Sequence, residues 1–331
     1  MRVLITGGAG FIGSHLAERH IELGDEVVVL DDLSTGRIQN LRLILQHPKF
    51  SFQQGSVMDL DVTSKAVEKC DIVYHLAASV GVRRVVDDPI GTIERNVSGT
   101  MCVLRAVDRF KKRLLFTSTS EVYGKSAKVP FSEDDDIVLG PTVKPRWGYG
   151  CSKAVDEFLI QAYMRQHGLY GVIVRLFNTV GPRQLGNYGM VIPTLVRQAM
   201  KQQPLTVFGT GEQMRCFLHV SDAVHALTQL ASESSAKGRV VNLGGTEEIS
   251  VNDLARRIKA ITTSSSQIHN IPYDDALGPG FEDIDRRVPD CTRVRQLIGF
   301  SPKFDIDAIL RSVVGHELSE KEGQFASGAL Q

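Results

Sequence analysis

The 331-residue chain has few cysteines and no long apolar run, and each shortage excludes a class of protein. Its five cysteines are odd in number and include no C-x-x-C pair, which excludes a disulfide scaffold and suits free thiols in a reducing compartment. No apolar run approaches the roughly 18 residues that a membrane helix needs. Strand-like sequence begins at Arg2 and leaves no room for a signal peptide. We therefore expect a cytoplasmic protein that is not embedded in a membrane.

The formal net charge of the chain is zero, which excludes further classes of binding partner. Lys plus Arg and Asp plus Glu number 38 each, so no global field would attract nucleic acid or an anionic membrane. The nine histidines show no paired spacing, and we predict no metal site. The sequence has no internal repeats or low-complexity tracts. The length suits one large domain or two interlocked ones.

Strand-like and helix-like segments alternate through the first half of the chain. Such alternation, with apolar strands, predicts a parallel α/β sheet covered by helices on both faces. The predicted strands are 2–6, 26–30, 50–54, 71–75, 113–118 and 171–176, and the predicted helices are about 13–23, 38–46, 62–69, 90–109 and 149–167.

The regular alternation of strand-like and helix-like segments ends after Asn178, where glycines and prolines interrupt it. The short segments that follow include predicted strands at 205–208 and 239–243 and predicted helices at 251–261 and 305–314. We expect residues 1–176 to form a cofactor domain and 177–331 mainly a smaller α/β substrate-binding domain. Segments near 216–245 are expected to return to the main sheet. The small, polar residues 319–331 are expected to fray.

A glycine-rich turn follows the first strand. Gly7, Gly10 and Gly13 allow a tight turn, close approach of the backbone to a pyrophosphate, and close packing of the next helix, whose N-terminus favours phosphate. The second strand ends in Asp31-Asp32. An acid at this point can accept both ribose hydroxyls of NAD and would repel the 2′-phosphate of NADP. The turn therefore predicts a doubly wound, Rossmann-type sheet that binds NAD.

Tyr149 is the only one of seven tyrosines with a lysine four residues on, Lys153. This spacing places both side chains on one face of a helix, and an ammonium near a phenol favours the phenolate. A buried strand ends just upstream in a cluster of hydroxyls and a carboxylate, Thr119-Ser120-Glu121. Together with the dinucleotide turn, these residues predict a redox site in which Tyr149 is the base.

Six short motifs lie along most of the chain: Thr-Gly-Gly-Ala-Gly-Phe-Ile-Gly at 6–13, His-Leu-Ala-Ala at 75–78, Glu-Val-Tyr-Gly at 121–124, Tyr-x-x-x-Lys at 149–153, Phe-Asn-Thr-x-Gly-Pro-Arg at 177–183 and His-Val-Ser-Asp at 219–222. Together they resemble the extended short-chain dehydrogenase/reductases that act on nucleotide sugars. The resemblance implies a cofactor retained through the cycle: a sugar hydroxyl is oxidised, the ketone reacts, and the same hydride is returned. The implied cofactor-binding residues are Gly7, Gly10, Phe11, Ile12, Gly13, Asp31, Asp32, Asp59, Leu76, Ala77, Ala78, Tyr149 and Lys153.

Within this family, the reaction of the ketone depends first on the stretch from Thr119 to Glu121. Members that dehydrate across C5 and C6 usually carry Thr-Asp-Glu, in which the Asp protonates the departing hydroxyl. This chain has Ser120 in place of that Asp. A serine is a poor acid for expelling hydroxide, so dehydration is disfavoured. Ser-Glu at this point resembles the UDP-glucuronate decarboxylases.

The second determinant is Arg146, three residues before the tyrosine. An arginine here also resembles the UDP-glucuronate decarboxylases, in which it faces the substrate carboxylate, whereas simple epimerases and dehydratases commonly have Ser-Pro-Tyr. A guanidinium binds carboxylate through two parallel hydrogen bonds. In the alternative interpretation, Arg146 is a loop arginine paired with Asp134, Asp135 or Asp136.

The residues that bind the nucleotide part of the substrate are implied by their positions in the family's motifs. Arg215 and Arg287 lie where the family clamps the diphosphate, Asn178 where it contacts the sugar or first phosphate, and Arg183 completes the predicted substrate-binding set. The segment from 184 to 190 departs from the decarboxylases and looks more like that of general hexose epimerases.

The resulting hypothesis is decarboxylation of UDP-glucuronate to UDP-xylose through a 4-keto intermediate. Tyr149 would take the O4 proton, Arg146 would position the carboxylate, and Glu121 would deliver a proton to C5 directly or through water. A UDP-sugar 4-epimerase acting on UDP-glucose or UDP-glucuronate is the main alternative, followed by a 4,6-dehydratase and by a non-catalytic NAD-sensing protein. The family resemblance also implies a homodimer through helices near 96–110 and 149–167.

Overall fold

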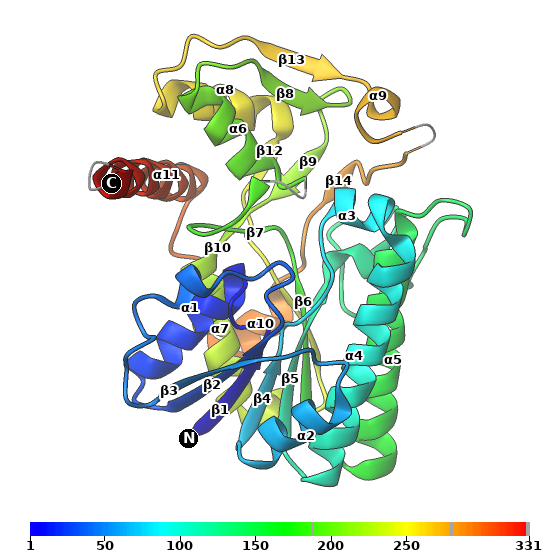
Figure 1. Cartoon of the computed structure of the whole chain (residues 1–331). Coiled ribbons are helices and arrows are strands. Elements are labelled where there is room, and N and C mark those ends of the chain that lie inside the picture. Colours follow the sequence, from blue (N-terminus) through cyan, green and yellow to red (C-terminus); the bar gives the residue numbers. More distant parts are fainter. Residues whose placement is uncertain (187–188, 279–280, 329–331) are drawn as a thin grey trace.

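The computed structural model describes residues 1–186, 189–278 and 281–328. These residues form a seven-stranded sheet in which all neighbouring strands are parallel (Figure 1). In sheet order the strands are β11 (Val240–Leu243), β6 (Gly171–Leu176), β5 (Arg113–Thr119), β4 (Ile72–His75), β1 (Arg2–Thr6), β2 (Glu26–Asp31) and β3 (Phe50–Gln54). The order reverses between β1 and β4, which creates a crevice at the carboxyl edge.

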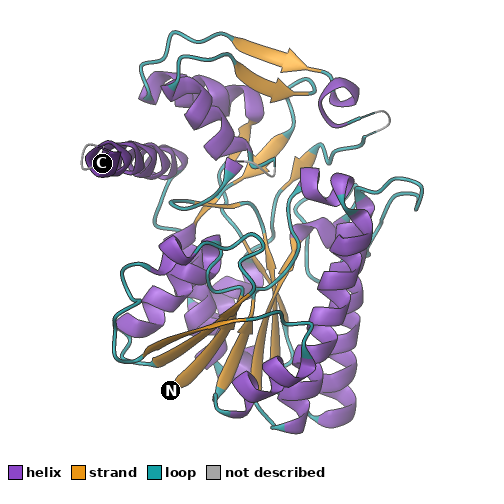
Figure 2. Ribbon diagram, in the orientation of Figure 1, coloured by secondary structure: helices purple, strands orange, loops and turns teal. Residues whose placement is uncertain are grey.

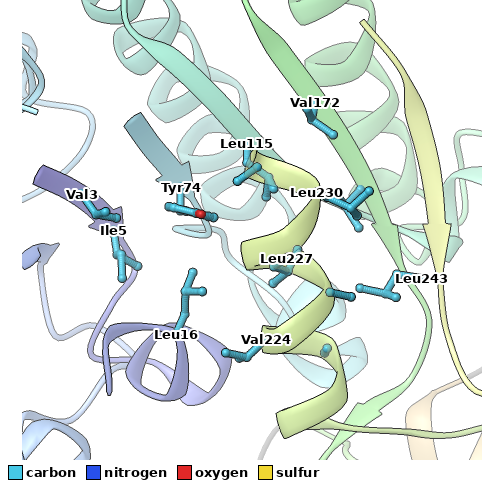
Figure 3. Close-up of a cluster of buried hydrophobic side chains, with 14 of the residues drawn as sticks. Val3, Ile5, Leu16, Tyr74, Leu115, Val172, Val224, Leu227, Leu230 and Leu243 are labelled. Carbon is cyan, nitrogen blue, oxygen red and sulfur yellow. The ribbon is translucent and has the colours of Figure 1, made fainter. Parts of the chain in front are cut away.

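Helices cover both faces of this sheet, as Figure 2 shows. Successive side chains of a strand point to opposite faces, so Val3 and Ile5 pack in one core and Leu4 in another. Leu16 and Leu227 join Val3 and Ile5 (Figure 3). One face carries α1 (Phe11–Glu22), α7 (Val220–Ser232) and α10 (Thr292–Ile298), and the other carries α2 (Leu60–Glu68), α4 (Pro89–Arg109) and α5 (Trp147–His167).

A smaller α/β unit lies beyond the carboxyl edge of the sheet (Figure 1). Its core joins α6 (Val191–Met200), α8 (Val251–Ile261), α11 (Ile306–Gly328) and β8 (Leu205–Phe208). Its other elements are β7 (Thr179–Val180), β9 (Met214–Cys216), β10 (Leu218–His219), β12 (Glu248–Ser250), β13 (Ile268–Ile271), α9 (Tyr273–Leu277) and β14 (Arg286–Arg287). The chain between them re-enters the main sheet through α7 and β11, which pairs with β6. We call this smaller unit the cap.

The predicted strands and long helices agree with the structure to within about two residues, except the helix predicted over 305–314, which runs on as α11 to Gly328. The helix predicted over 38–46 is wrong, because only a short 3₁₀ turn, Ile38–Leu41, forms there. Leu41 and Ile44 are buried while Leu43 and Leu45 are exposed, and this spacing of three suits 3₁₀ geometry. The frayed end predicted from 319 is replaced by helix α11 as far as Gly328, and residues 329–331 lie outside the described residues. No helix in the described ranges is both long and apolar enough to cross a membrane.

Candidate active site

A cavity of about 690 Å³ lies between the carboxyl edge of the sheet and the cap. Its volume is within the usual range for small-molecule sites. Of the residues predicted for the site, all line this cavity except Lys153 and Asp59. The Asp59 carboxylate accepts hydrogen bonds from the backbone N–H groups of Asp61 and Val62 and caps α2, which does not support its predicted cofactor contact.

The glycine turn requires glycine at two positions for steric reasons. Gly7 has φ of +70°, and a Cβ there would lie 2.7 Å from the Ala77 nitrogen. A Cβ on Gly13 would lie 2.3 Å from the carbonyl oxygen of Gly7. Helix α1 starts after Gly10 with no side-chain cap, so its first N–H groups face the cavity edge that Gly10, Phe11 and Ile12 line. Such a helix start favours phosphate.

Asp31 ends β2 beside this turn. Its carboxylate is 7% exposed and accepts hydrogen bonds from the Leu33 nitrogen at 2.8 Å and the Ala9 nitrogen at 2.9 Å. Burial raises the pKa of Asp31, and the two N–H donors oppose that rise. The carboxylate therefore lies at the cavity wall in a fixed orientation, with Asp32 next to it.

The end of β5 and the start of α5 meet closely. Thr119 accepts a hydrogen bond from the Glu121 nitrogen at 3.2 Å, which turns the chain at the strand end. A Cβ on Gly150 would lie 2.7 Å from the Glu121 carbonyl oxygen, so glycine at this position lets the first turn of α5 pack against that backbone. The contact brings Thr119, Ser120, Glu121 and Tyr149 to one wall of the cavity.

Lys153 is buried in α5, four residues after Tyr149. Its ammonium lies 3.8 Å from the centroid of the Phe116 ring and 3.6 Å from a carboxylate oxygen of Asp156. The expectation that Lys153 lowers the pKa of Tyr149 is not met by the protein groups alone. Burial first, and then the negative charge of Glu121, raise the pKa of Tyr149, while a hydrogen bond to Thr119 acts in the opposite direction.

Glu121 lies between two arginines. Arg146 donates to one of its oxygens at 2.7 Å, and Arg287 lies 2.8 Å from the other. Burial alone would raise the pKa of Glu121, but these two cations outweigh it and hold the pKa at about 2. Glu121 is thus ionised at neutral pH, and the expectation that it donates a proton directly does not fit these protein contacts.

Asp283 joins this cluster from the cap. It accepts hydrogen bonds from Arg146 at 3.1 Å, from Arg215 at 2.8 Å and from the Tyr273 hydroxyl at 3.0 Å. The arginines hold the pKa of the buried Asp283 carboxyl at about 2. We call Arg146, Arg215, Arg287, Glu121 and Asp283 the arginine cluster.

The Nε atoms of Arg146 and Arg287 are buried and have no hydrogen-bond partner among the described residues. A buried N–H without an acceptor is costly, and here both belong to cations that line the cavity. The cluster carries three positive and two negative charges. It is therefore suited to accept an additional anion, such as a carboxylate or a phosphate.

The alternative pairing of Arg146 with the acids at 134–136 is not found. Asp134 pairs with Arg293 and Asp135 with Lys128. Arg146 is 5% exposed and turns toward the cavity. The remaining predicted substrate residues separate into two places, because Arg215 and Arg287 lie in the cluster whereas Arg183 does not.

Arg183 contacts helix α1. It makes two hydrogen bonds to the carboxylate of Glu18, at 2.7 and 3.0 Å, and one to the Ser14 hydroxyl at 3.2 Å. Arg183 therefore lines the dinucleotide side of the cavity. Asn178 lies nearer the cap and donates to the Cys216 carbonyl oxygen at 2.9 Å.

Sequence reasoning missed Asp283 and Tyr273. Asp283 precedes the Arg286-Arg287 pair by three residues, and the acids of the Phe-Glu-Asp-Ile-Asp segment at 281–285 were the available signal for it, whereas nothing in the sequence marked Tyr273. The neighbouring Glu282 pairs with Lys144 at 2.5 Å and Lys125 at 3.2 Å, which ties this segment to the loop before α5. The described residues contain no group of three or more His, Cys, Asp or Glu side chains that could hold a metal ion.

A doubly wound sheet, a glycine turn beside a buried acid, and a Tyr–Lys pair on a helix define a dinucleotide-binding enzyme of the Rossmann class. Residues 3–244 match the model of the NAD dependent epimerase/dehydratase family, and the chain belongs to that family. NAD is accordingly its cofactor.

Among similar proteins of known activity is UDP-N-acetyl-alpha-D-glucosaminuronate decarboxylase of Bacillus cytotoxicus, 40% identical over 95% of this chain and 96% of that protein. UDP-glucuronic acid decarboxylase 1 of Xenopus tropicalis is 36% identical over 98% of this chain and 73% of that protein. The structure of UDP-glucuronic acid 4-epimerase from Bacillus cereus with UDP-glucuronic acid and NAD is also similar, with a TM-score of 0.86, 28% identity and coverage of 96% and 98%.

Proposed function

We propose that the protein decarboxylates UDP-glucuronate to UDP-xylose through a 4-keto intermediate. The observation that carries this proposal is the position of Arg146. Its buried guanidinium lines the same cavity as Tyr149, already binds two carboxylates, and has an Nε–H without a partner among the described residues. A group built in this way suits a third carboxylate, that of the sugar. Identity of 34–40% to uronate decarboxylases supports the same assignment.

In the proposed mechanism, bound NAD supplies the acceptor for the C4 hydride and its later return. Tyr149, assisted by Lys153 one helical turn further along α5, accepts the O4 proton while Thr119 hydrogen-bonds that oxygen. The C5 carboxylate then belongs to a β-keto acid, whose carbon–carbon bond breaks with its electrons passing into the C4 enolate. Arg146 orients the carboxylate before this step. Proton transfer by a positioned group of this kind contributes about 10²–10⁴-fold.

Protonation of C5 needs a donor, and Glu121 is ionised between its two arginines. We assign Glu121 to holding a water molecule against C5, which is the indirect form of its predicted role. When the substrate carboxylate competes for Arg146, Glu121 loses part of its positive surroundings, which raises its pKa and lets it take up a proton from solvent and pass that proton through the held water to C5. Ser120 lines the same wall, and no acid stands at its position to support dehydration.

For the cofactor, we assign the pyrophosphate to the turn of Gly7, Gly10 and Gly13 and the ribose hydroxyls to Asp31. Leu76, Ala77 and Ala78 line the cavity after β4 and are assigned to the middle of the cofactor. For the nucleotide of the substrate, Arg215 is assigned to the diphosphate. Arg287 contacts Glu121 and is therefore assigned to the sugar side of the diphosphate.

Two alternatives rest on specific observations. The relative that acts on the 2-acetamido analogue is 40% identical, so UDP-N-acetylglucosaminuronate is a candidate substrate for the same decarboxylation. The Bacillus cereus 4-epimerase acts on the same uronate, which keeps epimerisation as the alternative reaction. Decarboxylation and epimerisation differ in whether the sugar loses a carbon atom as CO2.

We also propose a homodimer, formed through α4 and α5. These helices lie side by side, and their outer surface bears exposed apolar side chains: Ile93 on α4 and Val155 and Phe158 on α5. Phe158 is 66% exposed. A cytoplasmic location is proposed on the ground of five free cysteines.

The test is incubation of the NAD-loaded protein with UDP-glucuronate and, separately, with its 2-acetamido analogue, followed by mass spectrometry. Loss of CO2 with formation of a UDP-pentose is expected, and Tyr149→Phe should abolish it. A UDP-hexuronate product with all its carbon retained would overturn the decarboxylase assignment in favour of the epimerase.

A further inference from the structure

Asp156 is a buried carboxylate that the mechanism above does not use. It lies in α5, three residues after Lys153, and has no exposed surface. Neither of its oxygens has a hydrogen-bond partner among the described residues. Burying an ionised carboxylate without donors is expensive, and such groups persist where the site depends on them.

The neighbours of Asp156 point to one interaction. Its nearest charged partner is the ammonium of Lys153, at 3.6 Å, and Lys153 has the Phe116 ring on another side. The Thr100 hydroxyl of α4 also lies beside the carboxylate. The next acid along the helix, Glu157, also acts on Lys153 through its charge, but less than Asp156. The Glu157 carboxylate accepts three hydrogen bonds from Arg175 and one from Ser118.

Thr100 is itself held in place. His75, at the end of β4, contacts the Thr100 hydroxyl at 3.2 Å through one ring nitrogen and the Thr6 hydroxyl at 2.7 Å through the other. Burial lowers the pKa of His75 to about 3, so the ring stays neutral and adds no charge near Asp156. A chain of buried polar groups thus runs from β1 through β4 and α4 to Asp156.

We propose that Asp156 is a positioning residue for the catalytic pair: its carboxylate holds the ammonium of Lys153 in place and keeps it protonated where water is excluded. The inference rests on the proposed role of Tyr149 and Lys153 in proton transfer. Burial lowers the pKa of Lys153, and the negative charge of Asp156 is the main effect that opposes this. Without that charge, Lys153 loses its proton at a lower pH and no longer stabilises the Tyr149 phenolate.

Asp156 also titrates, and this gives its role a pH signature. Burial raises its pKa from an ordinary 3.8 to about 6, although Lys153 and Thr100 oppose the rise. Below about pH 6, Asp156 is therefore largely protonated and supplies little negative charge. Above about pH 6, its charge supports Lys153. The effect of removing the carboxylate should accordingly be absent at low pH and grow as the pH rises.

The test is Asp156→Asn, which keeps the shape and removes the charge. An opposite charge at this range shifts a pKa by about 1–3 units. The alkaline limb of the kcat profile should therefore move about 1–3 pH units toward acid in the variant, while kcat of the two proteins coincides below about pH 6. Asp108→Asn, which removes an acid of α4 that pairs with Lys111 and with His167 at the far end of α5, is the matched control and should leave the alkaline limb unchanged.

A second readout is independent of turnover. In protein carrying ¹³Cε-labelled lysine, the NMR resonance of Lys153, assigned by its loss in Lys153→Met, should titrate about 1–3 units lower in Asp156→Asn than in the unmodified chain. Thr100→Val, which removes the hydroxyl that lowers the pKa of Asp156, should shift the Lys153 titration in the same direction and serves if the first variant does not fold. An unchanged Lys153 titration would overturn the proposal even if the protein turns over another nucleotide sugar. A shifted titration without uronate decarboxylation would overturn only the proposed substrate.

Discussion

Replacing Arg146 by alanine separates recognition of the sugar carboxylate from recognition of the nucleotide. UDP-glucuronate and UDP-glucose differ at one group, a carboxylate against a hydroxymethyl. Arg146 already donates to two carboxylates, at 2.7 and 3.1 Å, and retains a free buried Nε–H. A charge-assisted hydrogen bond contributes about 1.5–3 kcal/mol, or roughly 10- to 150-fold in affinity.

The expected result is therefore a roughly 10- to 150-fold weaker affinity of Arg146→Ala for UDP-glucuronate, with that for UDP-glucose nearly unchanged. Titration calorimetry on NAD-loaded protein measures both, and a Tyr149→Phe background prevents turnover during the titration. Arg197→Ala, which removes an arginine paired with Glu317 on the cap, is the control and should affect neither ligand.

The ion pairs that remain in Arg146→Ala define two outcomes that would contradict this prediction. In the variant, Glu121 keeps Arg287 and Asp283 keeps Arg215, so the walls of the cavity retain paired charges. If both ligands weaken equally, Arg146 acts by holding the shape of the cavity through those carboxylates. If neither weakens, the sugar carboxylate is bound elsewhere and the decarboxylase assignment loses its main support.

Three further outcomes are expected. Tyr149→Phe should keep folding and NAD binding but lose at least about 10²-fold in turnover, since it removes only the oxygen that accepts the proton; activity within tenfold of the original would rule this role out. Asp31→Ala should weaken NAD about 10- to 150-fold and NADP less, measured by calorimetry, and tighter binding of NADP by the unmodified protein would contradict it. Glu121→Gln should let the 4-keto intermediate accumulate with NADH. The variant should also be less stable to unfolding than the unmodified protein, by a difference that is full above about pH 4.5 and shrinks as the pH falls toward 2. The reason is that Glu121 stays charged down to about pH 2 in the folded protein but only to about pH 4.5 in the unfolded chain. Identical acid-denaturation curves for Glu121→Gln and the unmodified protein would contradict this expectation.

The local parts of the site could be predicted from the sequence because their geometry is local. Glycines at 7, 10 and 13 specify a turn, and four residues from Tyr149 to Lys153 specify one helix face. Apolar runs gave the strands because a parallel sheet covered on both faces buries every side chain of a strand. The helix predicted over 38–46 was wrong because apolar residues three apart fit a 3₁₀ turn as well as an α-helix.

The electrostatics could not be predicted, because they depend on contacts across long separations. Arg146 lies 25 residues from Glu121 and 137 from Asp283 in sequence, and only the packing of the cap against α5 brings them together. The same limit applies to Tyr149. Its lysine was visible in the sequence, whereas the burial and the neighbouring Glu121 that raise its pKa were not.

The position of Asp283 bears on how any anionic ligand enters. Its carboxylate comes from the cap and binds Arg146 and Arg215, while Glu282 beside it is tied to Lys144 before α5. An incoming carboxylate or diphosphate therefore meets guanidinium groups that are already paired, and the donors open to it are the Nε–H groups without a partner among the described residues. Discrimination between a charged and a neutral sugar then depends on how well each satisfies the buried N–H groups that Asp283 and Glu121 leave unpaired.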